Sequence, residues 1–151
     1  MDVWDKFKQT VEQMQAQLTA KKNVLNSAAF RDASMAMCAL VAAADGTVDP
    51  SETRRVAELI ADNEALRDLD KNDLQRRFHD YIDVLRTGGH VGKATVLSDI
   101  AKVRGNEDEA RAVVRIGVVI GGADGRFDPT ERTAVREVCR MLGLARADFG
   151  L

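Results

Sequence analysis

Two short acidic segments carry the side chains that are best suited to chemistry. Residues 44–52 read Ala-Asp-Gly-Thr-Val-Asp-Pro-Ser-Glu, and residues 123–131 read Ala-Asp-Gly-Arg-Phe-Asp-Pro-Thr-Glu, so six of nine positions are identical at an offset of 79. Carboxylate oxygens are the preferred ligands of hard divalent cations. The candidate metal ligands are therefore the three carboxylates of each copy: Asp45, Asp49, Glu52, Asp124, Asp128 and Glu131.

The spacing of these carboxylates matches only the second half of an EF-hand loop. The EF-hand positions 1 and 3 would be Val41 and Ala43 in the first copy, and Ile120 and Gly122 in the second. None of these has a side-chain oxygen, so the motif is not an EF-hand. Because Ca²⁺ takes about 6–8 oxygens, water or a second segment must complete each site. The motifs contain no histidine or cysteine, which favours Ca²⁺, Mg²⁺ or Mn²⁺ over zinc or copper. Whether the two motifs share one site stays open.

Helix capping is the alternative explanation for most of the motif. Asp49 is a good N-cap, Pro50 suits the first helical position, and Glu52 completes a capping box, as do their counterparts in the second copy. Gly46 can end the incoming helix with a positive φ. Capping does not explain Asp45 and its counterpart, which we expect to be the last residues of the incoming helices. An aspartate there opposes the helix macrodipole at a cost of roughly 0.3–1 kcal/mol, which predicts a compensating cation.

The rest of the sequence predicts an all-α protein. Apolar residues recur at steps of three and four, and no segment shows the alternation of a strand. Glycines and capping residues divide the pattern, with Gly88–Gly89, Gly105 and Gly143 as helix ends and Asn106 with Glu109 as a capping box. The predicted helices span about 2–25, 27–44, 50–63, 72–87, 91–103, 106–123 and 129–142, with one more turn at 145–149.

We expect a single compact domain over residues 1–151 with about seven to eight helices. The acidic motifs connect the helices of two pseudo-symmetric helical hairpins, with repeat units at about 28–63 and 107–142. The helix at about 2–25 has a narrow apolar stripe that includes Trp4, Phe7 and Met14. This stripe would suit a coiled coil, a membrane surface or the protein's own core. Its short length and its weakly basic polar face favour packing on its own domain.

Composition excludes several classes of protein. The 151 residues are 45% hydrophobic and 30% charged with a net charge of −2, which is typical of a soluble globular protein and not of a nucleic-acid binder. No apolar run approaches the ~18 residues of a transmembrane segment, and the first residues lack the apolar region of a signal peptide. The two cysteines, Cys38 and Cys139, lie in apolar helical patterns. We expect buried, reduced thiols there and not a disulfide or metal pair.

The chain resembles the TerB family of tellurite-resistance proteins. The resemblance rests on the apolar helix that leads into Ala44-Asp45-Gly46, on its second copy at residues 123–128, and on the tail that ends Phe149-Gly150-Leu151. It implies a cytoplasmic helical domain, a role in resistance to tellurite and other stresses, and cation binding by the acidic motifs. It also implies work beside other Ter proteins, including the membrane protein TerC, with peripheral association at the inner face of the membrane as one option.

The leading interpretation is a non-enzymatic, divalent-cation-binding helical scaffold for other Ter proteins, with Ca²⁺ as the preferred cation. A metal-dependent enzyme such as a phosphoesterase is one alternative, and a metal-free helical adaptor is another. An enzyme with two metals would need cations about 3.5–4 Å apart. Neither His79 nor His90 lies in an acidic cluster, and no glycine-rich phosphate loop is present, so we expect no enzymatic activity. The arginines that fit either an oxyanion or a solvated helix face are Arg54, Arg55, Arg76 and Arg77.

Overall fold

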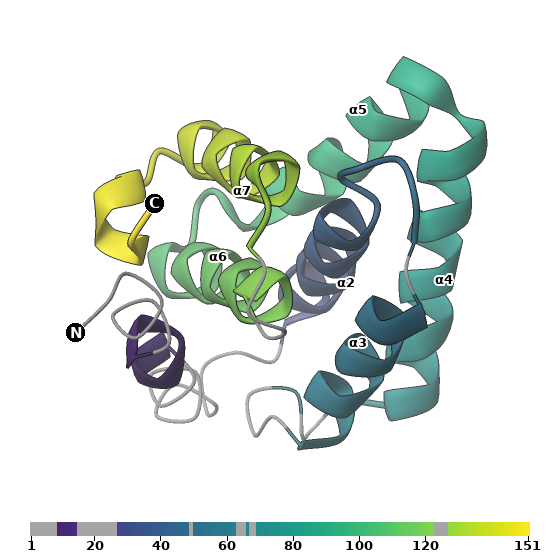
Figure 1. The fold of residues 1–151 in the computed structure, drawn as a ribbon, viewed down its shortest axis with the longest axis horizontal. Coiled ribbons are helices and arrows are strands. Elements are labelled where there is room, and N and C mark those ends of the chain that lie inside the picture. Colours follow the sequence, from purple (N-terminus) through teal and green to yellow (C-terminus); the bar gives the residue numbers. More distant parts are fainter. Residues whose placement is uncertain (1–8, 15–26, 49, 63–65, 67–68, 123–126) are drawn as a thin grey trace.

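The fold is built from helices. The computed structural model describes residues 9–14, 27–48, 50–62, 66, 69–122 and 127–151 (Figure 1). Within this part of the chain the structure contains helices and no strand, which confirms the predicted all-α class. The elements are α2 (Ala28–Ala42), α3 (Pro50–Asp62), α4 (Lys71–Thr87), α5 (Gly89–Ile100), η3 (Ala101–Val103), α6 (Glu107–Gly122), α7 (Pro129–Leu142) and η4 (Arg146–Phe149).

Helix α2 is the centre of the domain. It packs against α4, α5 and α6, and Figure 1 shows it between α4 and α6. Its run of alanines, methionines and small polar residues is buried from Ala33 to Ala42, which suits a helix surrounded on most sides. Cys38 on α2 and Cys139 on α7 are both buried free thiols, as predicted. Burial raises the pKa of Cys38 to about 12 and that of Cys139 to about 11, so neither is a reactive thiolate at neutral pH.

The repeat in the sequence is matched by the positions at which helices begin. The first residues of α2 and α6, Ala28 and Glu107, are 79 positions apart, and so are Pro50 of α3 and Pro129 of α7. The corresponding helices α2 and α6 pack directly on each other. Small residues allow this contact: a Cβ added at Gly117 of α6 would lie 2.3 Å from Cε of Met37.

The Gly88–Gly89 pair ends α4 as predicted, with Gly88 as the C-cap. The next helix begins earlier than predicted, because α5 starts at Gly89 and not at Val91. Gly89 takes a positive φ of 56°, and a Cβ added at Gly92 would lie 2.3 Å from the carbonyl oxygen of Val84. Glycine therefore allows α4 and α5 to cross closely at a sharp corner.

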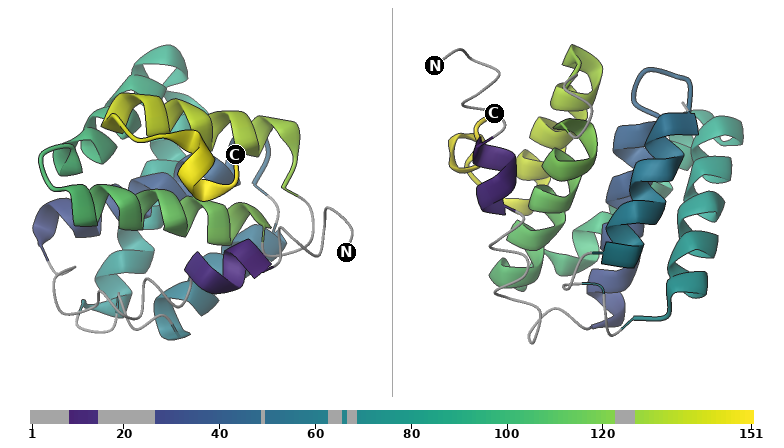
Figure 2. Two further views of the ribbon diagram at one scale, coloured as in Figure 1. Left: turned by 90° about the vertical axis from the view of Figure 1, so that its left-hand side faces the viewer. Right: turned by 60° about the horizontal axis from the view of Figure 1, so that its bottom comes forward.

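The described part of the N-terminal segment packs on its own domain, as predicted. Residues 9–14 are helical and lie beside η4 near the C-terminus (Figure 2). Met14 is buried in the hydrophobic core and Val11 packs against it. Trp4 and Phe7, together with the rest of the predicted helix at 2–25, lie outside the described residues.

Candidate metal centre

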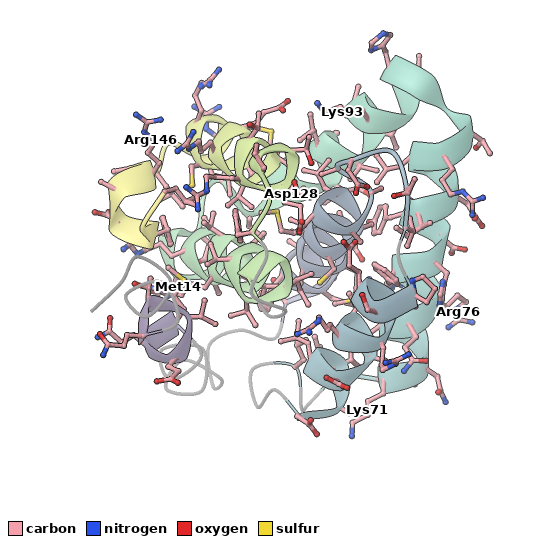
Figure 3. The ribbon with its side chains drawn as sticks, viewed as in Figure 1. Met14, Lys71, Arg76, Lys93, Asp128 and Arg146 are labelled. Atoms are coloured by element: carbon pink, nitrogen blue, oxygen red, sulfur yellow. The ribbon has the colours of Figure 1, made fainter. Side chains whose placement is uncertain are left out.

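The second acidic motif begins α7 with the predicted cap. Asp128 is the N-cap, and its Oδ1 accepts hydrogen bonds from the backbone N–H groups of Thr130 (2.9 Å) and Glu131 (3.0 Å). Pro129 follows at the first helical position. Hydrogen bonds from Thr130 and Glu131 lower the pKa of Asp128 and keep it ionised. Figure 3 shows Asp128 at the end of α7 that lies beside α2.

Glu131, in the first turn of α7, is a carboxyl group with a strongly raised pKa. Its side chain is only 6% exposed. Burial raises its pKa to about 9, and the hydrogen bond and charge of Asp128 and the charge of Glu52 act in the same direction. Negative charge thus gathers around a carboxyl group that has little water to stabilise its ionised form. Without a cation this group holds a proton at neutral pH.

Glu52 of the first acidic motif interacts with Glu131 of the second. It lies in the first turn of α3, is half-buried, and occupies the position that corresponds to Glu131 in the repeat. Its charge acts on Glu131, although 79 residues separate the two in sequence. The structure therefore brings Glu52, Asp128 and Glu131 into one electrostatic cluster, which we call the carboxylate cluster.

Asp45 does not occupy the predicted position. Helix α2 ends at Ala42, so Asp45 lies in the following turn and is exposed; the prediction that it closes the helix is wrong. Its Oδ1 accepts hydrogen bonds from the backbone N–H and the hydroxyl of Thr47, both at 3.0 Å. Gly46 follows with a φ of 88°, as predicted. These local hydrogen bonds stabilise the turn. Because Asp45 is not the last residue of the helix, the unfavourable interaction with the helix macrodipole no longer predicts a cation at Asp45.

The candidate ligands are only partly visible as one site. Asp49 and Asp124 lie outside the described residues. Among the described residues, no group of three or more histidine, cysteine, aspartate or glutamate side chains has the geometry to hold a metal. The donors of the carboxylate cluster are all oxygens, which is the ligand type that hard cations prefer.

Other candidate groups lie elsewhere. His79 and His90 are exposed, with the ring of His79 edge-on to Phe78 at 5.3 Å. Arg76 and Arg77 both bind Asp73, so their charges are engaged in ion pairs on α4.

In the part of the chain that is described, no helix is both long enough and apolar enough to cross a membrane.

One charged cluster was not predictable from the spacing of its residues. The Asp32 carboxylate on α2 accepts from Arg31 and Arg77 at 3.1 Å each and pairs with Lys102 at 3.4 Å. These residues come from three separate segments, and no spacing rule links them. The cluster joins α2 to α4 and η3 and has the character of a structural ion-pair network.

Comparison with known proteins identifies the family. A family model described as "Tellurite resistance protein TerB" matches residues 31–151, a range that contains both acidic motifs and the helices from α2 to η4 except for the first three residues of α2. No curated protein and no solved structure matches the chain.

Proposed function

The chain belongs to the family of the tellurite resistance protein TerB, and from this premise we propose that it serves tellurite resistance as a non-enzymatic helical scaffold that binds a divalent cation. We propose Ca²⁺ as the preferred cation, with Mg²⁺ and Mn²⁺ as weaker substitutes. In this proposal the two motifs form one shared site around the carboxylate cluster of Glu52, Asp128 and Glu131. The bound cation would supply positive charge that ties the two hairpins together.

The observation that carries the proposal is the raised pKa of Glu131. A buried carboxyl group surrounded by Asp128 and Glu52 is costly to ionise, and a proton is the simplest way to relieve that cost. A divalent cation relieves the same cost more effectively, because it neutralises two carboxylates at once. Ca²⁺ also needs more oxygen ligands than one motif contains, and two segments together provide more of them.

A metal-free helical adaptor is the second candidate. Two observations favour it: Asp128 is engaged as the N-cap of α7, and Asp45 is engaged in the turn after α2. In this alternative the motifs serve only to end one helix and start the next. A phosphoesterase has no comparable support, because neither His79 nor His90 belongs to a group that could hold a metal in the described part of the chain.

The partners proposed for the scaffold are other Ter proteins, among them the membrane protein TerC. The basis for this is family membership alone. The scaffold would work in the cytoplasm and reach the inner face of the membrane through such a partner.

A cation titration distinguishes the two candidates. Thermal unfolding and amide NMR spectra of the full chain are recorded in EDTA and then in millimolar Ca²⁺, Mg²⁺ or Mn²⁺. We expect Ca²⁺ to raise the melting temperature and to shift the amides of residues 50–53 and 128–132. If all three cations leave both readouts unchanged, the metal-free adaptor stands.

Matched variants then separate capping from metal binding. Glutamine is tolerated in a capping box, so Glu131→Gln and Glu52→Gln keep the cap and remove the ionisable carboxyl group that would bind the cation. Both substitutions are expected to abolish the effect of Ca²⁺ on the melting temperature. Glu58→Gln, which changes an exposed glutamate on α3, is the control and is expected to retain the full effect.

A further inference from the structure

An open groove lies between the turn after α2, the corner of α4 and α5, and the first half of α7. Its volume is about 880 Å³, within the range of roughly 300–1,000 Å³ that is typical of small-molecule sites. None of the candidate metal ligands that the structure describes lines it, although Thr47 and Thr130 beside them do. We call it the α5–α7 groove, and an inference about it does not depend on the proposed cation site.

The floor of the α5–α7 groove is apolar. Leu40 of α2 and Ala134 of α7 are almost fully buried beneath it, at 4% and 7% exposure. Leu85 of α4 and Val48 of the turn are partly buried at its sides. Such a floor favours contact with hydrocarbon, because covering it removes apolar surface from water.

The rim of the groove carries an excess of positive charge. Arg86 is exposed at the end of α4 and forms no ion pair with any residue in the described part of the chain. Lys93 of α5 lies between α5 and α7 (Figure 3) and pairs with Glu137 of α7 at 3.2 Å. Among the described residues that line the groove, two cations thus face one carboxylate around the opening.

The pair of Lys93 and Glu137 does not withdraw Lys93 from binding. Its side chains are 49% and 38% exposed, and ion pairs with this exposure contribute little to stability and are easily exchanged for another partner. Arg86 is held by nothing comparable, and its planar guanidinium can bind a carboxylate or phosphate through two parallel hydrogen bonds.

We propose that the α5–α7 groove binds a small organic anion that joins one carboxylate or phosphate group to a short hydrocarbon body. Arg86 binds the anionic group, Lys93 adds a second positive charge, and the body lies on Leu40, Leu85 and Ala134. Charge and shape together define this ligand class. A free inorganic anion would leave the floor uncovered, and an uncharged hydrocarbon would leave Arg86 without a partner.

A series of matched probes tests the proposal on the full chain in EDTA, so that cation binding plays no part. Amide NMR titrations compare hexanoate, hexyl phosphate, hexanol, hexylamine and inorganic phosphate. We expect hexanoate or hexyl phosphate to shift the amides of residues 85–93 and 129–137, and the tighter of the two identifies the anionic group. Hexanol, hexylamine and inorganic phosphate are expected to bind at least about tenfold more weakly, which is the effect of one charge-assisted hydrogen bond.

Substitutions of the groove residues test where the anionic group of the probe binds. Arg86→Gln is expected to weaken binding of the preferred probe about tenfold, and Lys93→Gln to weaken it less. Arg76→Gln, which changes an exposed arginine about three turns earlier on α4, is the control and is expected to have no effect. Thermal unfolding of each variant verifies that it is folded. Equal binding of hexanol and hexanoate, unchanged binding in Arg86→Gln, or no shift with either anionic probe would overturn the proposal.

Discussion

The carboxylate of Glu52 in the first turn of α3 lies close enough to Glu131 in the first turn of α7 for its charge to raise the pKa of Glu131. The two glutamates hold equivalent positions in the repeat, three residues into helices that begin 79 positions apart. A capping residue has no need of such a neighbour. Burial and Asp128 raise the pKa of Glu131 more strongly than Glu52 does, and the approach of this equivalent carboxyl group adds to their effect.

We expect the stability of the cation-free protein to fall as pH rises. Burial and the neighbouring carboxylates raise the pKa of Glu131 to about 9 in the folded protein, against an ordinary value of 4.5. A raised folded-state pKa gives stability that is complete below pH 4.5 and is lost as pH rises through 9. For one proton, the free energy of unfolding changes by up to about 1.4 kcal/mol per pH unit in this window. Urea unfolding in EDTA between pH 5 and 9 measures this slope.

The variant Glu131→Gln provides the control for that slope. The amide keeps the neutral form at every pH, so the fall in stability between pH 5 and 9 should become markedly shallower. Ca²⁺ should stabilise the wild-type protein more at pH 8 than at pH 5, because it competes with the proton for the same carboxylates. Identical slopes in the wild type and the variant would contradict the assignment of the raised pKa to Glu131.

A second prediction concerns Asp45. Asparagine can accept the same hydrogen bonds from Thr47, so Asp45→Asn should change the free energy of unfolding by less than about 0.5 kcal/mol. Asp45→Ala removes the acceptor and should cost about 0.5–1.5 kcal/mol. Since Asp45 is exposed and engaged in its turn, Asp45→Asn should weaken Ca²⁺ binding far less than Glu131→Gln does. Calorimetric titration of both variants checks this order, and the reverse order would make Asp45 the principal ligand.

Local rules predicted the parts of the structure that depend on neighbours in sequence. Half of the predicted capping box of Asn106 and Glu109 is present, because Asn106 Oδ1 accepts from Glu109 N at 3.1 Å. The Glu109 carboxylate accepts from Asn106 Nδ2 at 3.1 Å and not from the Asn106 backbone N–H, which donates to Val103 O. The cap at Asp128 and the burial of Met14 followed from the same kind of pattern. These features are fixed within one or two helical turns, which is the range over which spacing rules apply.

The features that the sequence could not predict depend on packing between distant segments. Helix α2 stops at Ala42 although alanines continue to position 44, so nothing local marks the end and Asp45 was misplaced. The encounter of Glu52 with Glu131, and the α5–α7 groove, arise only when the hairpins and the α4–α5 corner are assembled. Propensity and periodicity carry no information about which equivalent positions of two repeats will meet.

A third prediction concerns a contact that ties the starts of α2 and α6 together. Ser27, the N-cap of α2, accepts from Phe30 N and donates its hydroxyl to the carboxylate of Glu109, which is 4% exposed. Ser27→Ala should cost about 1 kcal/mol and Glu109→Ala about 2–3 kcal/mol, because Glu109 also binds Asn106. A double-mutant cycle should give a coupling energy of about 0.5–2 kcal/mol. The control is Ser98→Ala at an exposed serine, whose effect on the free energy of unfolding should add to that of Glu109→Ala. If the effects of Ser27→Ala and Glu109→Ala were also additive, the two caps would act independently.

A fourth prediction tests the corner of α4 and α5, which forms one wall of the groove. In Gly92→Ala the new Cβ would lie 2.3 Å from the carbonyl oxygen of Val84. This oxygen belongs to the backbone, which cannot relieve the clash by a change of rotamer as a flexible side chain can. We expect the free energy of unfolding to fall by about 1–3 kcal/mol, and the melting temperature to fall by about 2–4 °C for each kcal/mol. Gly105→Ala is the matched control, because its Cβ would meet nothing within 4 Å and its φ is not positive. That control should be neutral or stabilising by about 0.4–1 kcal/mol, since alanine restricts the unfolded chain. Thermal and urea unfolding of the two variants give the comparison, and equal stability would mean that α4 and α5 do not cross as closely as Val84 and Gly92 require.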